Sequence, residues 1–169
     1  MSDAFIIHRL GQGDVAAYRE IRLEALERHP AAFGASFEDE AAQPAAAYER
    51  RLLTSDVFGG LIGGTLMGIV RFSIEPGAKR HHIGVLTGMY VRESARGSGL
   101  ASALVQRIIH TAQGRVERVN LTVTALNEAA LRLYQRHGFR IYGTEPDALK
   151  VAGRNYDEHL MTREIAAQC

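Results

Sequence analysis

The segment Arg-Gly-Ser-Gly-Leu-Ala at residues 96–101 is the part of the chain whose residue types and spacing most directly indicate chemistry. Gly97 and Gly99 carry no Cβ, so the backbone amides of this turn are free to point inward. The turn leads into a helical pattern, and the first turn of a helix leaves N–H groups unpaired at the positive end of its dipole. Such a turn suits a diphosphate, although the same glycines also suit a tight structural connection. A Walker loop is excluded because no Gly-Lys-Ser/Thr follows, and a dinucleotide fingerprint is disfavoured because Ser102 replaces its third glycine.

A second block of interest starts at Asn127, where an extended run ends and a residue suited to cap a helix stands. On the helix expected to follow, Ala130 and Tyr134 are four residues apart and share a face. Gly138 then stands where a left-handed C-cap would end that helix. A purely structural interpretation of the block, as a cap, a core aromatic residue and a C-cap, carries equal weight if the block is taken alone.

The elements that position both blocks are indicated by hydrophobic periodicity and by turn residues. We expect strands at residues 4–10, 57–62, 65–74, 82–91, 116–124, 139–142 and 154–164, and helices at residues 14–29, 45–53, 99–113 and 127–137. Residues 31–44 show a mixed pattern. The order predicts a mixed sheet with helices on its faces, formed by a single domain over residues 1–169.

Composition excludes several classes of protein. The chain has 169 residues, 46% of them hydrophobic, a formal net charge of +1 and no Trp, so we expect a folded core and no nucleic-acid partner. Cys169 is the one cysteine, which excludes a disulfide or a cysteine metal site within one chain, and we expect no metal. The N-terminal residues lack the build of a signal peptide, and no apolar run approaches the roughly 20 residues of a membrane helix. We therefore expect no membrane partner and a cytoplasmic protein.

Taken together, the two blocks resemble the motifs of the GNAT superfamily of acyl-CoA N-acyltransferases. Residues 89–91 lead into residues 96–101, which resemble its pyrophosphate motif, (Gln/Arg)-x-x-Gly-x-(Gly/Ala). Residues 127–139, Asn-x-x-Ala-x-x-x-Tyr-x-x-x-Gly-Phe, resemble its second cofactor block. The resemblance implies an α/β (α+β) fold with a GNAT-like mixed central sheet of about seven strands flanked by about four helices.

The resemblance also implies acetyl-CoA as co-substrate and assigns residues to it. The backbone of the strand before the turn would pair with the pantetheine arm, the amides of the turn would hold the diphosphate, and the second block would contact the thioester end. The implied cofactor-binding residues are Met89, Tyr90, Val91, Arg96, Gly97, Ser98, Gly99, Leu100, Ala101, Asn127, Ala130 and Tyr134.

The implied activity is N-acetyl transfer by direct attack of an amine on the thioester in a ternary complex, with Tyr134 as the catalytic residue. A phenol with a pKa of about 10 is protonated at neutral pH and donates to the departing sulfur. A backbone N–H near Met89 would stabilise the oxyanion. We expect a small-molecule amine as acceptor. The alternatives are a protein or peptide acetyltransferase, acting on an N-terminus or a lysine, and a non-catalytic acyl-CoA-binding sensor.

The base that accepts the amine's proton is not indicated, because the strand at residues 84–89 lacks the glutamate that many members of the family carry there. Glu38, Glu40 and His82 are candidates, as is loss of the proton to water. Histidine has the most suitable unperturbed pKa of these side chains.

The acceptor would lie across the sheet from acetyl-CoA. The family's architecture places Phe33, Phe37, Glu38 and Tyr156 there as candidate substrate-binding residues, although for each of them alone a loop that packs on the core is the favoured interpretation. A homodimer is a further expectation, because the strand at residues 156–165 offers an edge that a second copy would pair with.

Overall fold

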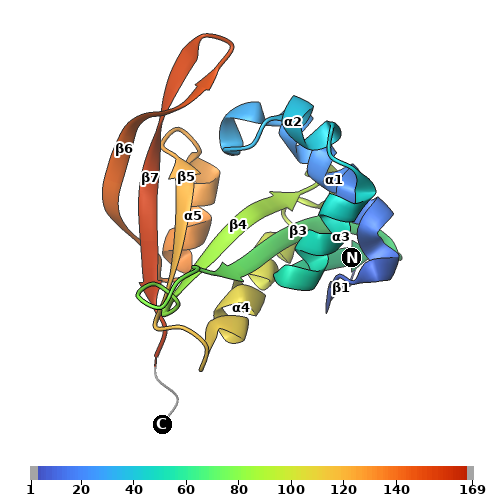
Figure 1. The fold of residues 1–169 in the computed structure, drawn as a ribbon, viewed down its shortest axis with the longest axis horizontal. Helices are drawn as coiled ribbons and strands as arrows, with labels where there is room; N and C mark the ends of the chain where they lie inside the picture. Colours follow the sequence, from blue (N-terminus) through green and yellow to red (C-terminus); the bar gives the residue numbers. More distant parts are fainter. Residues whose placement is uncertain (1–3, 167–169) are drawn as a thin grey trace.

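The computed structural model describes residues 4–166 and has one mixed seven-stranded sheet in the order β1-β2-β3-β4-β5-β7-β6 (Figure 1). The strands are β1 Phe5–Arg9, β2 Asp56–Ile62, β3 Thr65–Ile74, β4 Ile83–Val91, β5 Arg118–Thr124, β6 Arg140–Val151 and β7 Arg154–Glu164. The α-helices are α1 Val15–Arg28, α2 Phe37–Ala41, α3 Ala45–Thr54, α4 Leu100–Ala112 and α5 Glu128–Arg136, and the 3-10 helices are η1 Gln12–Asp14, η2 Pro30–Ala32 and η3 Glu93–Ala95. The predicted mixed α/β fold is confirmed.

Two elements differ from the sequence prediction. The mixed segment at residues 31–44 contains α2, which makes five α-helices, and the Oγ of Ser36 caps it by accepting a hydrogen bond from the N–H of Asp39 at 3.1 Å. Strand β6 continues nine residues past the predicted end at residue 142. The hydrophobic pattern did not indicate this extension, because Pro146 interrupts the alternation of residues along the strand. The pairing register also shifts between Glu145 and Leu149, where the strand bulges.

Helices cover the sheet on both faces, and alternation along the strands separates two cores. In β3, Val70 and Phe72 belong to the core under α4 and α5, whereas Ile69 belongs to the core under α1 and α3. Strands β5 and β7 carry their apolar residues, such as Val119 and Met161, toward the α4 and α5 side. Their other face is more polar, and it becomes part of the candidate site described below.

The sheet opens between β4 and β5, its one parallel pair. These strands pair only at Ile83–Arg118, Gly84–Val119 and Val85–Asn120, and then separate toward their carboxyl ends, as Figure 1 shows. The remainder of β4 has strand partners on the β3 side only. A strand edge in the middle of the sheet is therefore left without a neighbouring strand.

A β-bulge bends β4 within this open region. Tyr90 pairs with Ile69 and Thr87 pairs with Arg71, so two residues of β4, Gly88 and Met89, oppose one residue of β3. Gly88 has a φ of 62°, a conformation that strongly favours glycine. The extra residue puts Thr87 and Tyr90, which are three positions apart, on the same face of the sheet, where they pair with Arg71 and Ile69.

The expectation that β7 offers a free edge is wrong. Strand β7 lies between β5 and β6 and pairs with both. Strand β6 pairs with the edge of β7 that was expected to be free for pairing with a second copy of the chain.

Packing at Gly84 provides a test of the fold. A Cβ at this position would lie 2.8 Å from Cζ of Phe72 and 3.2 Å from a methyl group of Val116, and Phe72 is completely buried. We expect Gly84→Ala to lower the free energy of unfolding by about 1–3 kcal/mol, measured by urea denaturation. Gly13→Ala is the matched control, because nothing lies within 4 Å of its Cβ, and we expect a change within about 0.5 kcal/mol. Equal stability of Gly84→Ala and wild type would contradict this packing.

Candidate functional site

The glycine-rich turn presents a set of unpaired amides at the start of α4. Gly97 and Gly99 have φ values of 79° and 87°. The N–H groups of Arg96, Ser98 and Leu100 donate to Glu93, Ala95 and the Ser98 hydroxyl respectively. The N–H groups at 97, 99 and 101 have no acceptor among residues 4–166, which leaves alternate amides available at the positive end of the helix dipole.

A cavity of about 510 Å³ connects this turn to the open edge of β4 and to α5. It is lined by ten of the twelve residues predicted to bind the cofactor: Met89, Tyr90, Val91, Arg96, Gly97, Gly99, Leu100, Ala101, Asn127 and Ala130. Its other lining residues are His29, Ala32, Phe33, Ala95, Ser102, Ala129, Leu133 and Arg136, none of which the sequence motifs indicated. We call this space the donor cavity. The structure thus brings the two sequence blocks together around one site.

A second cavity, of about 390 Å³, lies on the α1 and α3 side of the sheet. It is lined by Tyr18, Arg22, Ala32, Phe33, Gly34, Ala35, Glu40, Arg51, Arg71, Leu86, Thr87, Gly88, Thr122 and Glu158, and we call it the polar cavity. Ala32 and Phe33 line both cavities, and the two residues of the β4 bulge are divided between them, with Gly88 in the polar cavity and Met89 in the donor cavity. The two spaces therefore meet at the bulge.

The family to which this chain belongs is decided by comparison with known proteins. A family model described as the Acetyltransferase (GNAT) family matches residues 17–139. The chain belongs to the GNAT family. The resemblance seen in the sequence motifs is confirmed.

Two curated relatives match part of the chain. L-amino acid N-acetyltransferase AaaT of Escherichia coli (strain K12) is 30% identical over 104 residues, which cover 60% of this chain and 64% of that protein. An L-methionine sulfoximine/L-methionine sulfone acetyltransferase of Pseudomonas aeruginosa is 33% identical over 110 residues, covering 63% of this chain and 59% of that protein. The chain thus matches less than two thirds of the length of these relatives.

Solved structures share the whole fold. An acetyltransferase of the GNAT family from Streptococcus pneumoniae superposes with a TM-score of 0.84 at 26% identity, covering 96% of this chain and 100% of that one. The structure of yncA from Salmonella typhimurium, which contains its cofactor acetyl-CoA, superposes with a TM-score of 0.82 at 22% identity, covering 98% and 96% of the two chains. The likeness to yncA shows a common fold.

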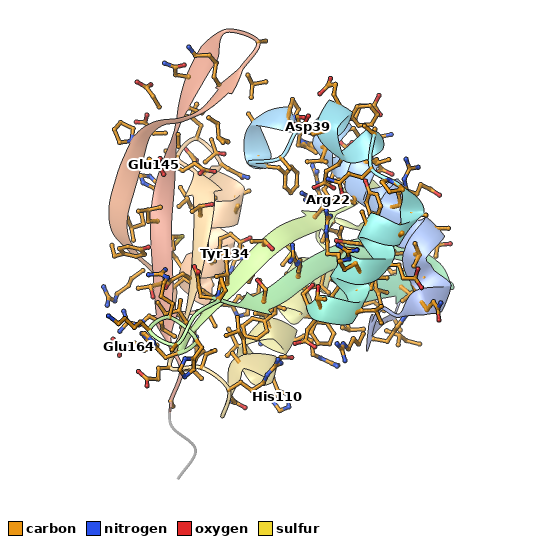
Figure 2. The ribbon with its side chains drawn as sticks, viewed as in Figure 1. Arg22, Asp39, His110, Tyr134, Glu145 and Glu164 are labelled. Carbon is orange, nitrogen blue, oxygen red and sulfur yellow. The ribbon has the colours of Figure 1, made fainter. Side chains whose placement is uncertain are left out.

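Tyr134 lies on α5 and is almost completely buried, at 5% exposure; it does not line the donor cavity, although Ala130 and Leu133 on the same helix do. Its ring packs edge-on against Phe139 at 5.9 Å between centroids, and Figure 2 places it near β4. Its hydroxyl makes no hydrogen bond with any of residues 4–166. Burial raises the pKa of this hydroxyl, so the phenol stays protonated at neutral pH.

Asn127 caps α5, and its contact with the cofactor stays a prediction. Its Oδ1 caps α5 by accepting a hydrogen bond from the N–H of Ala130 at 3.2 Å, and the residue also lines the donor cavity. Ser98, in contrast, does not line that cavity; its hydroxyl instead donates to the carbonyl of Ala95 at 2.6 Å.

Glu40, one of the candidate bases, is engaged in a buried ion pair. Its carboxylate lies 2.8 Å from Arg22 Nη2 and 3.2 Å from Arg51 Nη1, and these side chains are 6%, 11% and 16% exposed. Burial alone would raise the pKa of Glu40, but the hydrogen bonds and charges of Arg22 and Arg51 lower it below its usual value. A carboxylate held in this way is poorly suited to accept a proton.

The other candidate bases lie elsewhere. Glu38 is exposed and lines a third cavity, of about 760 Å³, between the α1–α2 region and the tip of the β6–β7 hairpin. Phe33 and Phe37 line the same cavity, so three of the four predicted substrate-binding residues are together. Tyr156 is not among its lining residues and lies under Arg154, 5.0 Å from the guanidinium carbon to the ring centroid. His82, next to the start of β4, lines none of these three cavities.

The sequence motifs missed the charged residues of the polar cavity, above all Arg71 and Glu158. A signal for Arg71 was present, because it is a charged residue inside the otherwise apolar pattern of β3. No comparable signal marked Glu158, which stands in the polar strand β7.

None of the helices between residues 4 and 166 is both long enough and apolar enough to cross a membrane. Within the same residues, no group of three or more His, Cys, Asp or Glu side chains is arranged to hold a metal ion.

The ion pair at Glu40 predicts how stability depends on pH. Glu40→Gln leaves two buried guanidinium groups without their shared carboxylate, and we expect it to cost about 3 kcal/mol of unfolding free energy at pH 7. Because the folded-state pKa of Glu40 is lowered, its contribution is fully present above the unfolded value of about 4.3 and is lost as the pH falls through the folded value. The stability difference between wild type and Glu40→Gln should therefore shrink in urea denaturation below about pH 4.3.

Glu38→Gln is the matched control for this experiment, because Glu38 is exposed on the same short helix and makes no ion pair within residues 4–166. We expect this variant to match wild-type stability at every pH. A Glu40→Gln deficit that stays constant from pH 7 to pH 3 would show that the ionised carboxylate is not what stabilises the cluster.

Proposed function

We propose that this protein transfers an acetyl group from acetyl-CoA to the amino group of a small molecule, by direct attack in a ternary complex. The observation that carries the proposal is the donor cavity, which joins the unpaired amides before α4 to the open edge of β4 and to Asn127 on α5. Membership of the GNAT family and the printed activities of the relatives support it.

The residues of the donor cavity fit the parts of acetyl-CoA. The free N–H groups of Gly97, Gly99 and Ala101 suit a diphosphate, and the helix dipole and the Arg96 side chain add positive charge beside them. Residues 89–91 present a strand edge with no neighbour on the β5 side, which suits the amide groups of pantetheine. These main-chain donors and acceptors are fixed by the fold and need no rearrangement to bind.

When bound, acetyl-CoA supplies the thioester carbonyl that the amine attacks and the sulfur that leaves. Tyr134 would donate the proton that the sulfur needs: it follows Leu133, which lines the donor cavity, on α5, and its buried hydroxyl stays protonated and has no hydrogen-bond partner among residues 4–166. The meeting of the donor and polar cavities at the β4 bulge supports a ternary complex, since both substrates have room at the same time.

The size of the polar cavity supports a small acceptor. A volume of about 390 Å³ is in the range of cavities that enclose single small molecules. The printed names of two relatives, whose substrates are L-amino acids and methionine derivatives, point to the same class.

Thiol release from acetyl-CoA tests the proposal directly. We expect release with at least one small amine in a panel of amino acids, amines and short peptides, and acetylated product by mass spectrometry. Tight binding of acetyl-CoA without release on any acceptor would instead indicate a sensor.

Tyr134→Phe separates the chemical step from binding. Loss of the hydroxyl should lower the single-turnover rate by about 100-fold, the size typical of a general acid, and leave the Kd for acetyl-CoA within about twofold. Tyr142→Phe is the matched control, because Tyr142 is an exposed tyrosine on β6, and should retain the wild-type rate. An unchanged single-turnover rate in Tyr134→Phe would remove Tyr134 from the acid role.

A further inference from the structure

One end of the polar cavity carries more positive than negative charge. Arg22, Arg51 and Arg71 all line it, and Glu40 is the one carboxylate that pairs with any of them within residues 4–166. Guanidinium groups remain charged at neutral pH, so two positive charges at this end are uncompensated. The site is buried enough that bulk water screens these charges only weakly.

Arg71 is the member of this group that has no ion-pair partner among residues 4–166. Its Nε donates to the Ser55 hydroxyl at 2.9 Å, which holds the side chain in place. Burial, together with the charges of Arg51 and Arg22, lowers the pKa of Arg71, and because the guanidinium still remains charged at neutral pH, an anion beside it would be stabilised. A held guanidinium with free donors is the geometry that binds a carboxylate through paired hydrogen bonds.

The opposite end of the polar cavity carries Glu158. Alternation along the strands puts Arg71 on β3, Thr87 on β4, Thr122 on β5 and Glu158 on β7 on one face, across four adjacent strands. The side chains at both ends line the same cavity, with the two threonines between them. Glu158, which attracts cations, and Arg71, which attracts anions, thus lie at opposite ends of the cavity, with Thr87 and Thr122 between them.

The surroundings of Glu158 favour its accepting a proton. Burial raises the pKa of Glu158, and the charge of Glu145, its direct partner on β6, raises it further. From the facing elements, the charged groups that share the cavity are Arg22, Arg51, Arg71 and Glu40. Figure 2 shows Arg22 and Glu145 on opposite sides of this open face of the sheet.

We propose that the polar cavity is the acceptor site and that its acceptor is an amine carrying a carboxylate, as in an α-amino acid, with the carboxylate on Arg71 and the amino group facing Glu158. This assignment rests on the proposed acetyl transfer and names the acceptor for it. Glu158 replaces the base that β4 lacks, and the amino group lies on the side of the cavity that adjoins the β4 bulge and the donor cavity.

The proton balance of the step follows from this arrangement. The acceptor enters as an ammonium ion, and Glu158 takes one proton from it, which frees the nitrogen lone pair. The nitrogen forms a bond to the thioester carbonyl carbon as the C–S bond breaks, and the sulfur leaves with a proton from Tyr134. The nitrogen then loses a second proton, which reprotonates Tyr134. The products are one amide and one thiol, and Glu158 releases the first proton to solvent.

Acceptor preference tests the carboxylate site. Each of several L-amino acids is compared with its amide and with the amine that lacks the carboxylate, with thiol release as the readout. We expect kcat/KM for the acid to exceed that for the amide by at least about tenfold. In Arg71→Met the acid should lose this advantage, mainly through a rise in KM, while the amide changes little. Arg71→Lys should restore part of the preference, and Arg107→Met, which removes an arginine stacked on Phe58 outside the cavity, should retain all of it.

Equal or better turnover of amides and plain amines in the wild-type protein would overturn the carboxylate assignment and leave the acetyl transfer standing. An unchanged acid preference in Arg71→Met would overturn the role of Arg71. Absence of turnover on the whole panel, with acetyl-CoA bound, would overturn the proposed function as well.

The pH profile tests Glu158. Activity needs its deprotonated form, so kcat should fall as the pH falls through its raised pKa. Glu158→Gln should lower kcat by about 100-fold and remove this acidic limb. Glu145→Gln removes the neighbouring like charge and should move the limb to lower pH with little loss of rate at the optimum. Glu164→Gln, at the exposed far end of β7, is the control and should leave the profile unchanged. A Glu158→Gln variant that keeps both the rate and the limb would overturn the base assignment.

Discussion

The early separation of β4 from β5 is the constraint on which the rest of the site depends. Parallel pairing ends after Val85–Asn120, although both strands continue. The β5-facing edge of residues 89–91 is therefore left without a strand partner, and Ala32 and Phe33 line both the donor cavity and the polar cavity. The bulge at Gly88 and Met89 comes after the last β4 residue that pairs with β5, Val85, and so lies within this opening.

An open sheet needs stabilisation from elsewhere, and different contacts supply it on each face. Strand β5 pairs with β7 along its whole length, and α4 packs its buried residues, such as Leu104 and Ile108, against the strands on one side. On the other side the cluster of Arg22, Glu40 and Arg51 ties α1, α2 and α3 together. Arg22 also stacks on Phe33, 5.2 Å from its ring centroid, so the ion pair that stabilises the helices also shapes the wall of the polar cavity.

The residues on the donor side of the proposed reaction could be predicted from the sequence more completely than those on the acceptor side. The donor side depends on local features: a glycine turn at a helix start and a capped helix that follows a strand. Ten of the twelve residues predicted to bind the cofactor line the donor cavity. On the acceptor side, Phe33 lines the polar cavity and, with Phe37 and Glu38, a neighbouring cavity; Tyr156 lines neither, and Arg71 and Glu158 were not predicted. The extension of β6 was also missed, because a proline and a bulge break the alternation that marks a strand.

The sequence by itself indicated the order of the strands and of four of the five α-helices, the resemblance to the GNAT family and the two blocks that line the donor cavity, because each of these follows from residues within a short span of chain. Only the tertiary structure decided which charges meet. In the sequence Glu40 is one of three consecutive acidic residues with nothing to distinguish it, whereas in the fold two arginines from other helices form ion pairs with it. Arg71 and Glu158 face one cavity because β3 and β7 lie on either side of β4 and β5 in the sheet, and strand order of this kind is set by long-range packing that no local pattern records.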